Sequence, residues 1–267
     1  MNFKILLFIL ILSSVSVHAD LTDDLEAYYK FDGNLSDSVG SADLTGVGIA
    51  YNDTYGILNG GYKYTYRSSN QAYGLASDNP FSNGDSEFTI SLWYKPTTTA
   101  LIVPFSMRAS TYSMIIYNAN TEVYFTLSTS GGLGSLVTTS SPITINAWNN
   151  VIFTYKNGNG LKCYVDGSLV LTDTTRTGTL VIGATENLRF GKNGASSSSQ
   201  AFGGYIDDSG FWSRELNSSE VSEIYNSGTG LQYPFSTSTG WSGNYIGMTD
   251  LSYYNGISEI DNIIGVV

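Results

Sequence analysis

The stretch NNVIFTYKNGNGLKCYVDG, residues 149–167, holds two alternating apolar runs separated by Asn157-Gly158 and Asn159-Gly160. Successive side chains of a strand point to opposite faces, so this alternation predicts two half-buried strands. Asn-Gly pairs favour the positive φ values that tight hairpin turns need. Asp166-Gly167 marks a second turn directly after the hairpin. The stretch is therefore predicted to be a β-hairpin that leads into a further strand.

The same pattern continues outward from this hairpin in both directions. Short alternating runs occupy residues 88–94, 122–128, 168–172, 179–183, 187–191 and 204–212, with turn signals between them. A regular series of short strands is typical of an all-β sandwich or barrel. One helix is predicted at residues 218–226, because Asn217 can cap it and Glu220 stands three residues later, as in a capping box.

The first 19 residues have the layout of a secretory signal peptide. Lys4 precedes an apolar run over residues 5–12, and Val17-His18-Ala19 places small residues where cleavage requires them. A membrane anchor is the alternative, but the apolar run is shorter than the roughly 20 residues that span a bilayer. We therefore expect a secreted, extracellular protein that starts at Asp20, with no later membrane span.

The C-terminal residues 236–267 differ in character from the rest. They follow Phe235, begin with a Ser/Thr/Gly spacer, and repeat an Ile/Asn-Gly pattern about every nine residues, as at Ile246-Gly247 and Asn255-Gly256. Fewer than three full units are present, which is too few for independent stability. The tail is predicted to be a small β-rich module that needs a partner surface or self-assembly; chance similarity is the alternative.

Charge and composition exclude several function classes. The chain has 12 basic and 23 acidic residues, and removal of Lys4 with the leader makes the mature charge more negative than −11. Nucleic acid binding needs clustered Lys and Arg, so it is not expected. The only histidine, His18, also leaves with the leader. Ser-His-Asp and Cys-His catalysis are therefore excluded in the mature protein.

The composition also limits which metal ions the protein can bind. A single cysteine and no mature histidine make zinc and copper sites improbable, whereas oxygen ligands suit calcium. Cys163 alternates in phase with Leu161 and Val165, which predicts a buried thiol that packs as a small apolar group. An intermolecular disulfide is the alternative for Cys163.

Four stretches, in order, resemble the laminin-G-like, concanavalin A-like lectin/glucanase jelly roll of secreted and phage-type proteins. They are LEAYYKFDGNLSDSVG (25–40), FTISLWYKP (88–96), AWNNVIFTYKNGNGLKCYVDGSLV (147–170) and GGYIDDSGFWSRELNSSEVSEIYN (203–226). The resemblance implies a two-sheet antiparallel jelly-roll sandwich, which we assign to residues 20–235. It also implies that the 204–212 strand lies beside the first strand. It does not fix a function, because this fold carries binding modules, structural parts and glycosidases.

Two adjacent aspartates within the strand GYIDDSGFW are unusual. By strict alternation Asp207 shares the inward face with Phe211, and Asp208 shares the opposite face with Trp212. A buried carboxylate must be paired or coordinated. We therefore predict a structural calcium site formed by four oxygen donors, Asp32, Asn34, Asp37 and Asp207. The alternative is that Asp207 accepts backbone N–H groups of the first-strand turn without a metal.

Aromatic residues suggest a ligand surface. The faces opposite the apolar ones carry Trp93, Tyr124 and Tyr164 among Thr, Ser and Lys. Flat rings amid hydroxyls can stack on sugar faces, so these three are the predicted ligand-binding residues. Packing within the domain is the alternative, because the family pattern often has aromatics at Trp93 and Tyr164.

Catalytic carboxylates are not identified. Glu259 and Asp261 begin a glucanase-like motif, but Ile264 stands where its final Glu belongs. The sequence thus favours a secreted non-enzymatic module that recognises extracellular carbohydrate or protein, with a role in adhesion. The alternatives are a structural or assembly component of a surface, filament or virion, attached through the tail, and, more weakly, a glycan-active enzyme.

Overall fold

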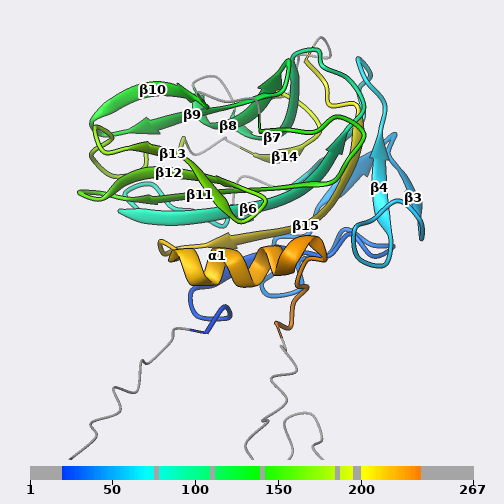
Figure 1. Cartoon of the computed structure of the whole chain (residues 1–267), viewed down its shortest axis with the longest axis horizontal. Coiled ribbons are helices and arrows are strands. Elements are labelled where there is room, and N and C mark those ends of the chain that lie inside the picture. The colour runs from blue at the N-terminus through cyan, green and yellow to red at the C-terminus, as the bar shows by residue number, and fades with distance from the viewer. Residues whose placement is uncertain are drawn as a thin grey trace, which may run out of the picture. The chain divides into compact units, whose positions relative to one another are not determined.

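A computed structural model describes residues 20–74, 78–108, 112–138, 142–183, 187–194 and 200–235. Within these ranges the chain forms two antiparallel β-sheets that pack face to face, with one α-helix on the outside (Figure 1). The predicted all-β jelly-roll sandwich with one short helix is confirmed. The predicted signal peptide (1–19) and the predicted β-rich tail (236–267) lie outside the described residues.

Sheet A has eight strands in the described part of the chain, in the order β13-β12-β11-β6-β15-β4-β3, with β1 also paired to β15. Their bounds are β1 (Leu25–Tyr29), β3 (Ala50–Asn52), β4 (Gly61–Tyr64), β6 (Glu87–Pro96), β11 (Asn149–Lys156), β12 (Gly160–Val165), β13 (Ser168–Asp173) and β15 (Gly204–Trp212). The β11–β12 pair is the predicted hairpin. β15 lies against β6 on one side and against β4 and then β1 on the other. The expected pairing of the first strand with the 204–212 strand is therefore confirmed.

Sheet B has seven strands among the described residues, in the order β10-β9-β8-β7-β14-β5-β2. Their bounds are β2 (Thr45–Val47), β5 (Gln71–Tyr73), β7 (Ile102–Arg108), β8 (Tyr112–Ala119), β9 (Glu122–Thr129), β10 (Gly132–Val137) and β14 (Leu188–Phe190). The prediction of a strand at residues 179–183 is wrong. Its backbone N–H groups bond to two different segments, at Asp85 and Ser128, so only an isolated bridge at Leu180 forms.

The main core fills the space between the sheets. Alternate residues of β6, β11 and β15, such as Ile90, Phe153 and Phe211, are fully buried there. Phe211 packs against several other rings, among them Phe105 and Phe190. Cys163 lies in this core, as predicted, and burial raises the pKa of its thiol.

A second apolar cluster covers the outer face of sheet A. Helix α1 (Ser218–Tyr225) buries Val221 and Ile224 there, and its capping box at Asn217 and Glu220 is formed as predicted. Trp212 joins the two ends of the domain on this face: its Nε1 donates to the carbonyl of Leu21 at 2.7 Å, and its ring stacks on Phe235. Both ends of the described domain therefore lie on the α1 side (Figure 1).

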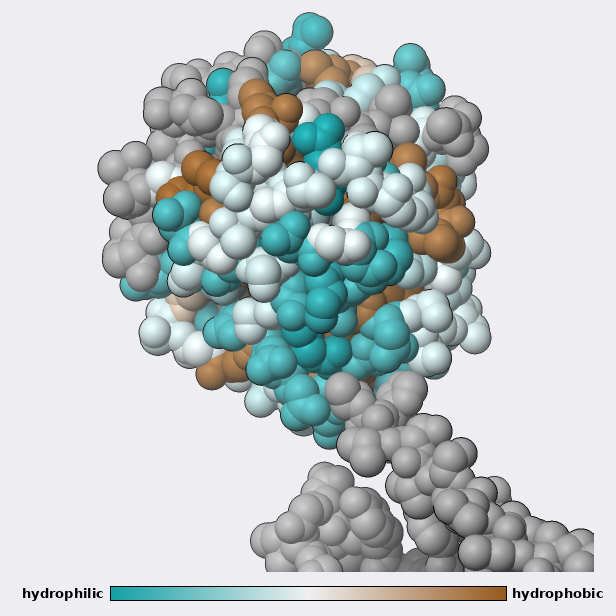
Figure 2. Space-filling view, turned by 90° about the vertical axis from the view of Figure 1, so that its left-hand side faces the viewer, coloured by the Kyte–Doolittle hydropathy of each residue, from teal (hydrophilic) through white to brown (hydrophobic). Residues whose placement is uncertain are grey.

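The surface at the left-hand end of the sandwich in Figure 1 is mostly hydrophilic or neutral, with hydrophobic residues in separate patches (Figure 2). Such scattered patches are ordinary for a soluble surface and mark no interface by themselves. No helix in the described ranges is long and apolar enough to cross a membrane.

Because Phe211 is fully buried among aromatic rings, we expect Phe211→Ala to lower the free energy of unfolding by about 3–5 kcal/mol. Urea titration followed by tryptophan fluorescence measures this change. Leu169→Ala is the control, because Leu169 lies on edge strand β13 with its side chain 53% exposed; we expect a change within about 0.5 kcal/mol there. A Phe211→Ala variant as stable as the control would contradict this description of the core.

Candidate functional site

The two aspartates of β15 lie at a β-bulge. Asp207 pairs with Trp93 of β6 and Ser209 pairs with Leu92, so Asp208 is the extra residue, with φ at +32°. A bulge reverses the alternation of side chains beyond it. Asp207 therefore lies on the outer face of sheet A with Trp93, and not on the inward face with Phe211 as strict alternation predicted. The bulge lies where β15 changes its partner from β4 to β1.

Both carboxylates are nonetheless buried, because other segments cover them. Asp207 Oδ2 accepts hydrogen bonds from the backbone N–H groups of Ile57 and Leu58, at 2.8 and 3.1 Å. Asp208 Oδ1 accepts from the Tyr28 hydroxyl at 2.8 Å and from Gln232 Nε2 at 3.2 Å. The pair thus holds three separate segments: the 53–60 loop, strand β1 and the C-terminal arm after α1.

The environment favours the neutral form of these acids. Burial raises the pKa of Asp207, and the neighbouring Asp208 raises it further. Burial also raises the pKa of Asp208. Asp207 Oδ1 is buried and has no hydrogen-bond partner within the described structure. Protonation of these acids reduces the cost of burying two adjacent carboxyl groups. Both side chains are enclosed, at 0% and 2% exposed, so they do not face an open cleft where a substrate could reach them.

The four predicted calcium ligands do not converge. Asp37 organises the turn after β1, where its carboxylate accepts from the N–H groups of Tyr28, Val39 and Ala42. Asn34 accepts from Ser36, and Asp32 accepts from the 59–60 turn. In the part of the chain that the structure describes, no three His, Cys, Asp or Glu residues are grouped to hold a metal ion. The alternative prediction, that backbone N–H groups of the first-strand turn donate to Asp207, is also wrong. The N–H groups that donate to Asp207 belong to the 53–60 loop.

Calcium binding itself stays a prediction. An ion at these residues would have to displace N–H donors that already occupy the carboxylates. A rise in unfolding temperature on adding calcium, reversed by a chelator, would support an ion site. An unchanged unfolding temperature in excess chelator would contradict it.

The three predicted aromatic ligands lie in different places. The Trp93 ring is 2% exposed and stacks on Tyr225 of α1, with centroids 5.9 Å apart, so the expectation of an open Trp93 surface is wrong. Tyr164 is also buried, in the cluster under α1. It lines a hollow of about 310 Å³ in which Lys162 pairs with Glu215 at 2.6 Å. Helix α1, which was predicted from the sequence, covers these two rings. The structure therefore supports the alternative that Trp93 and Tyr164 pack within the domain.

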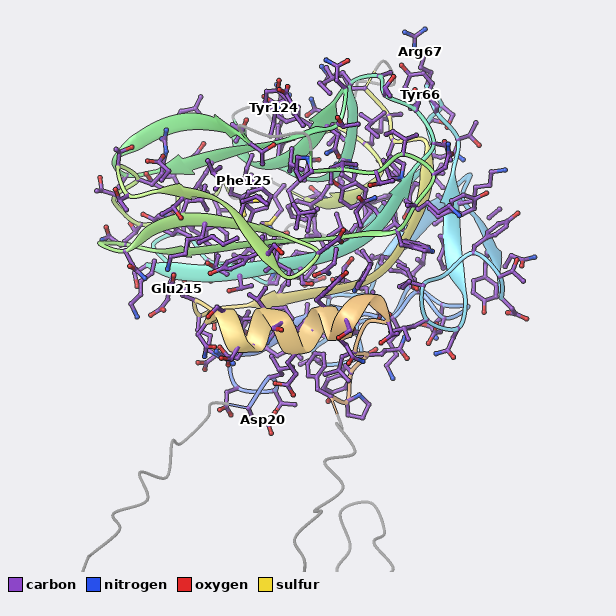
Figure 3. All side chains as sticks on the ribbon, in the orientation of Figure 1. Asp20, Tyr66, Arg67, Tyr124, Phe125 and Glu215 are labelled. Carbon is purple, nitrogen blue, oxygen red and sulfur yellow. The ribbon has the colours of Figure 1, made fainter. Side chains whose placement is uncertain are left out.

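Tyr124 lies on the opposite side of the molecule. It projects from β9 on the outer face of sheet B, whereas its neighbour Phe125 points between the sheets (Figure 3). The Tyr124 ring stacks on Tyr117 of β8, with centroids 4.7 Å apart and planes 13° apart. Its hydroxyl donates to Glu122 Oε2 at 2.8 Å. Each ring thus covers one face of the other, and both side chains are half-buried. We call this stacked pair, with its remaining open faces and edges, the Tyr117–Tyr124 platform.

A hollow of about 350 Å³ lies beside this platform. We call it the sheet B groove; its lining residues are Leu101, Val103, Ile115, Tyr117, Thr126, Leu133, Asn193 and Gln200. Leu101 and Leu133 are among the most exposed large apolar residues described, at 37% and 55%. The lining combines apolar side chains with hydroxyl and amide groups and contains no charged residue. Such a surface matches the mixed apolar and hydrogen-bonding character of a sugar ring.

Tyr117 was missed from the sequence, although a signal for it exists. Strands β8 and β9 are joined at Asn120-Thr121, and Ala119 pairs with Glu122. A hairpin centred on Asn120-Thr121 places Tyr117 directly opposite Tyr124. Strand register gives no indication of Asn193 and Gln200, because they come from the segment after β14.

The pH dependence of stability should report the buried acid pair. The folded-state pKa values lie above the ordinary 3.8, so the neutral pair stabilises the fold at low pH, and this contribution is lost as pH rises toward the raised values. We expect the free energy of unfolding to fall between about pH 5 and about pH 8, and Asp207→Asn to flatten this slope. The exposed Asp23→Asn is the control. An unchanged slope in Asp207→Asn would refute the description of these acids as neutral in the folded protein.

Comparison with known proteins gives three results. The laminin G family described as "Concanavalin A-like lectin/glucanases superfamily" matches residues 68–222 of this chain. No relative is found among curated protein sequences. Many solved structures match, and the three described below share less than 25% identity with this chain, which shows the fold alone.

Two of these structures are toxin binding domains. The receptor binding domain of botulinum neurotoxin D has a TM-score of 0.61 and 16% identity, covering 76% of this chain and 52% of the toxin domain. The binding domain of Paraclostridial Mosquitocidal Protein 1 has a TM-score of 0.62 and 16% identity, covering 77% and 52%. The chain therefore spans about half the length of these domains.

A third structure is similar along nearly its whole length. Domain 4 of an extracellular arabinanase from Geobacillus stearothermophilus, in complex with arabinotriose, has a TM-score of 0.57 and 23% identity, covering 75% of this chain and 97% of that domain. The matched residues 68–222 make up more than half of the 267 residues and include most of both sheets, from β5 through β15. The chain belongs to the concanavalin A-like lectin/glucanases superfamily, as a domain of the laminin G type.

Proposed function

We propose that this protein is a secreted, non-enzymatic carbohydrate-binding module that takes a neutral oligosaccharide in the sheet B groove. The observation that carries this proposal is the stacked Tyr117–Tyr124 platform beside a hollow lined by amide and hydroxyl groups. Carbohydrate rings present flat C–H faces that stack on aromatic rings and hydroxyls that need hydrogen-bond partners. Both kinds of contact are present within one surface.

The chemistry of the lining favours an uncharged ligand. The polar groups of the lining are the Thr126 hydroxyl and the amides of Asn193 and Gln200. The two amides bond to each other, and sugar hydroxyls can replace such partners because they both donate and accept hydrogen bonds. An acidic sugar would enter a groove that has no cation in its lining, and it would approach a protein whose net charge is −11. A neutral sugar meets no such electrostatic penalty.

The placement of the groove suits a displayed binding module. Leu21 and Phe235, near the two ends of the described domain, both pack on the outer face of sheet A. The groove is lined by residues of β7, β8 and β9 on the outer face of sheet B. Sheet B forms the other layer of the sandwich (Figure 1). The two ends of the described domain are therefore on the face opposite the groove, which is consistent with a role in adhesion.

The comparisons support the same class of function. One neighbour in fold is an arabinanase domain in complex with arabinotriose, and others are receptor binding domains of toxins. The buried acid pair of β15 is enclosed and supplies no open pair of carboxylates for glycoside hydrolysis. Binding without hydrolysis is therefore the activity that we propose.

The groove predicts the effect of removing one ring. We expect Tyr117→Ala to weaken binding of neutral oligosaccharides about fivefold to tenfold, because stacking at a partly open aromatic contributes on the order of 1 kcal/mol. Isothermal titration calorimetry with arabino-, xylo- and gluco-oligosaccharides, chosen after a glycan array, measures the affinity. Far-UV circular dichroism checks that the variant is folded.

Tyr51→Ala is the matched control, because Tyr51 is an exposed tyrosine, 39% accessible, on β3 of the other sheet. It should leave the affinity unchanged. Wild-type protein that binds no neutral glycan on the array, or binding that is equally reduced by Tyr51→Ala and Tyr117→Ala, would refute the assignment of the groove. Release of reducing sugar from a bound glycan would refute the non-enzymatic part.

A further inference from the structure

A second polar surface lies at the end of sheet A that α1 does not cover. Tyr205 of β15 pairs with Lys63 of β4 on one side and with Lys95 of β6 on the other. The neighbouring residues Ile206 and Tyr94 lie in the core, so this row of three faces outward. β4, β15 and β6 run side by side at this end of the molecule (Figure 1). We call Lys63, Tyr205, Lys95 and the adjoining Tyr55 the Lys-Tyr-Lys row.

The row combines flat rings with cations. Lys95 Nζ lies 5.6 Å from the centroid of the Tyr205 ring. Tyr55 packs edge-on against Tyr205, with centroids 5.0 Å apart and planes 62° apart. Adjacent strands are about 4.8 Å apart, so the two lysines start about 10 Å from each other across Tyr205. An anionic group at the edge of the Tyr205 ring, between the two lysines, is within reach of both flexible side chains.

The charge of the row is unbalanced. Four ion pairs occur among the described residues, and they engage Lys156, Lys162, Arg176 and Arg214. Neither Lys63 nor Lys95 pairs with a carboxylate in the described ranges, although the chain has about two acidic residues for each basic one. Two neighbouring cations without counter-charges in so acidic a protein leave a local site for an anion.

The loop that carries Tyr55 is fixed in place. Asp207 holds the N–H groups of Ile57 and Leu58, and Asp32 holds that of Gly60. The backbone closes so tightly that a Cβ at Gly56 would lie 1.9 Å from the carbonyl oxygen of Gly60. Tyr55 is thus positioned before a ligand arrives, which lowers the entropy cost of binding. Asp207 therefore helps to position Tyr55, because it binds the backbone of the loop that carries this tyrosine.

We propose that the Lys-Tyr-Lys row binds the carboxylate of a uronic acid residue in an acidic glycan. The ammonium groups of Lys63 and Lys95 contact the carboxylate, and the exposed part of the Tyr55–Tyr205 pair packs against the sugar ring. Nucleic acids and anionic membranes are bound through clusters of many cations, whereas this row supplies two. This site is on the other sheet from the neutral groove and does not depend on it.

Binding of oligogalacturonate, compared with the same oligomer as its methyl ester, tests the proposal. The ester keeps the sugar ring and removes the charge. We expect calorimetry or fluorescence titration to show binding of the acid form that weakens with added salt, and at least about tenfold weaker binding of the ester. Equal affinity for the two forms, or no binding of the acid form, would overturn the proposal.

Variants locate the site. Lys63→Gln and Lys95→Gln should each weaken binding of the acid form about fivefold or more, whereas Lys156→Gln, which removes a lysine paired with Glu87, should not. Tyr117→Ala should also leave it unchanged, so failure of this proposal is distinguishable from failure of the neutral groove. An equal loss in Lys156→Gln and Lys95→Gln would show a non-specific charge effect and refute the site.

Discussion

The buried carboxylate of Asp207 is the interaction on which the outer side of sheet A depends. It lies on the central strand β15, at the bulge where that strand exchanges β4 for β1, and it accepts two backbone N–H groups of the 53–60 loop. Asp208 beside it holds the Tyr28 hydroxyl and the side chain of Gln232. One pair of adjacent acids therefore connects an early loop, the first strand and the C-terminal arm. Because water is excluded from the pair, each lost partner would leave a buried polar group unsatisfied.

The two outer faces of the sandwich have different roles. On sheet A, Trp93, Tyr164 and Trp212 are covered by α1 and by the ends of the domain, so these large rings stabilise the fold. On sheet B, no described helix or chain end covers Tyr117 and Tyr124, and both rings are half-buried beside an uncharged groove. Rings of the same chemical kind are thus structural on one face and available for a ligand on the other. Among the described residues, the difference comes from the location of helix α1 on sheet A.

Most of the architecture could be predicted from alternation and turn chemistry. The 149–167 hairpin, the 204–212 strand and the capped helix after Asn217 all form as expected, because each is specified by local sequence. The site could be predicted only in part. Tyr124 lies on an open outer face as expected, but Trp93 and Tyr164 do not, since alternation assigns a side chain to a face without saying what covers that face. The inward position expected for Asp207 failed because one bulged residue shifts the alternation, and a bulge has no clear sequence signal here.

By itself, the sequence determined the fold class, the family resemblance and the burial of Cys163. These properties follow from composition and from contacts between residues close in sequence. Only the tertiary structure decided that Asp207 binds the 53–60 loop, that Tyr117 joins Tyr124, and that Lys63 and Lys95 flank Tyr205. These residues are far apart in the chain or on different strands. Strand order, register and the layer that covers each face bring them together, and those are properties of the whole packed domain.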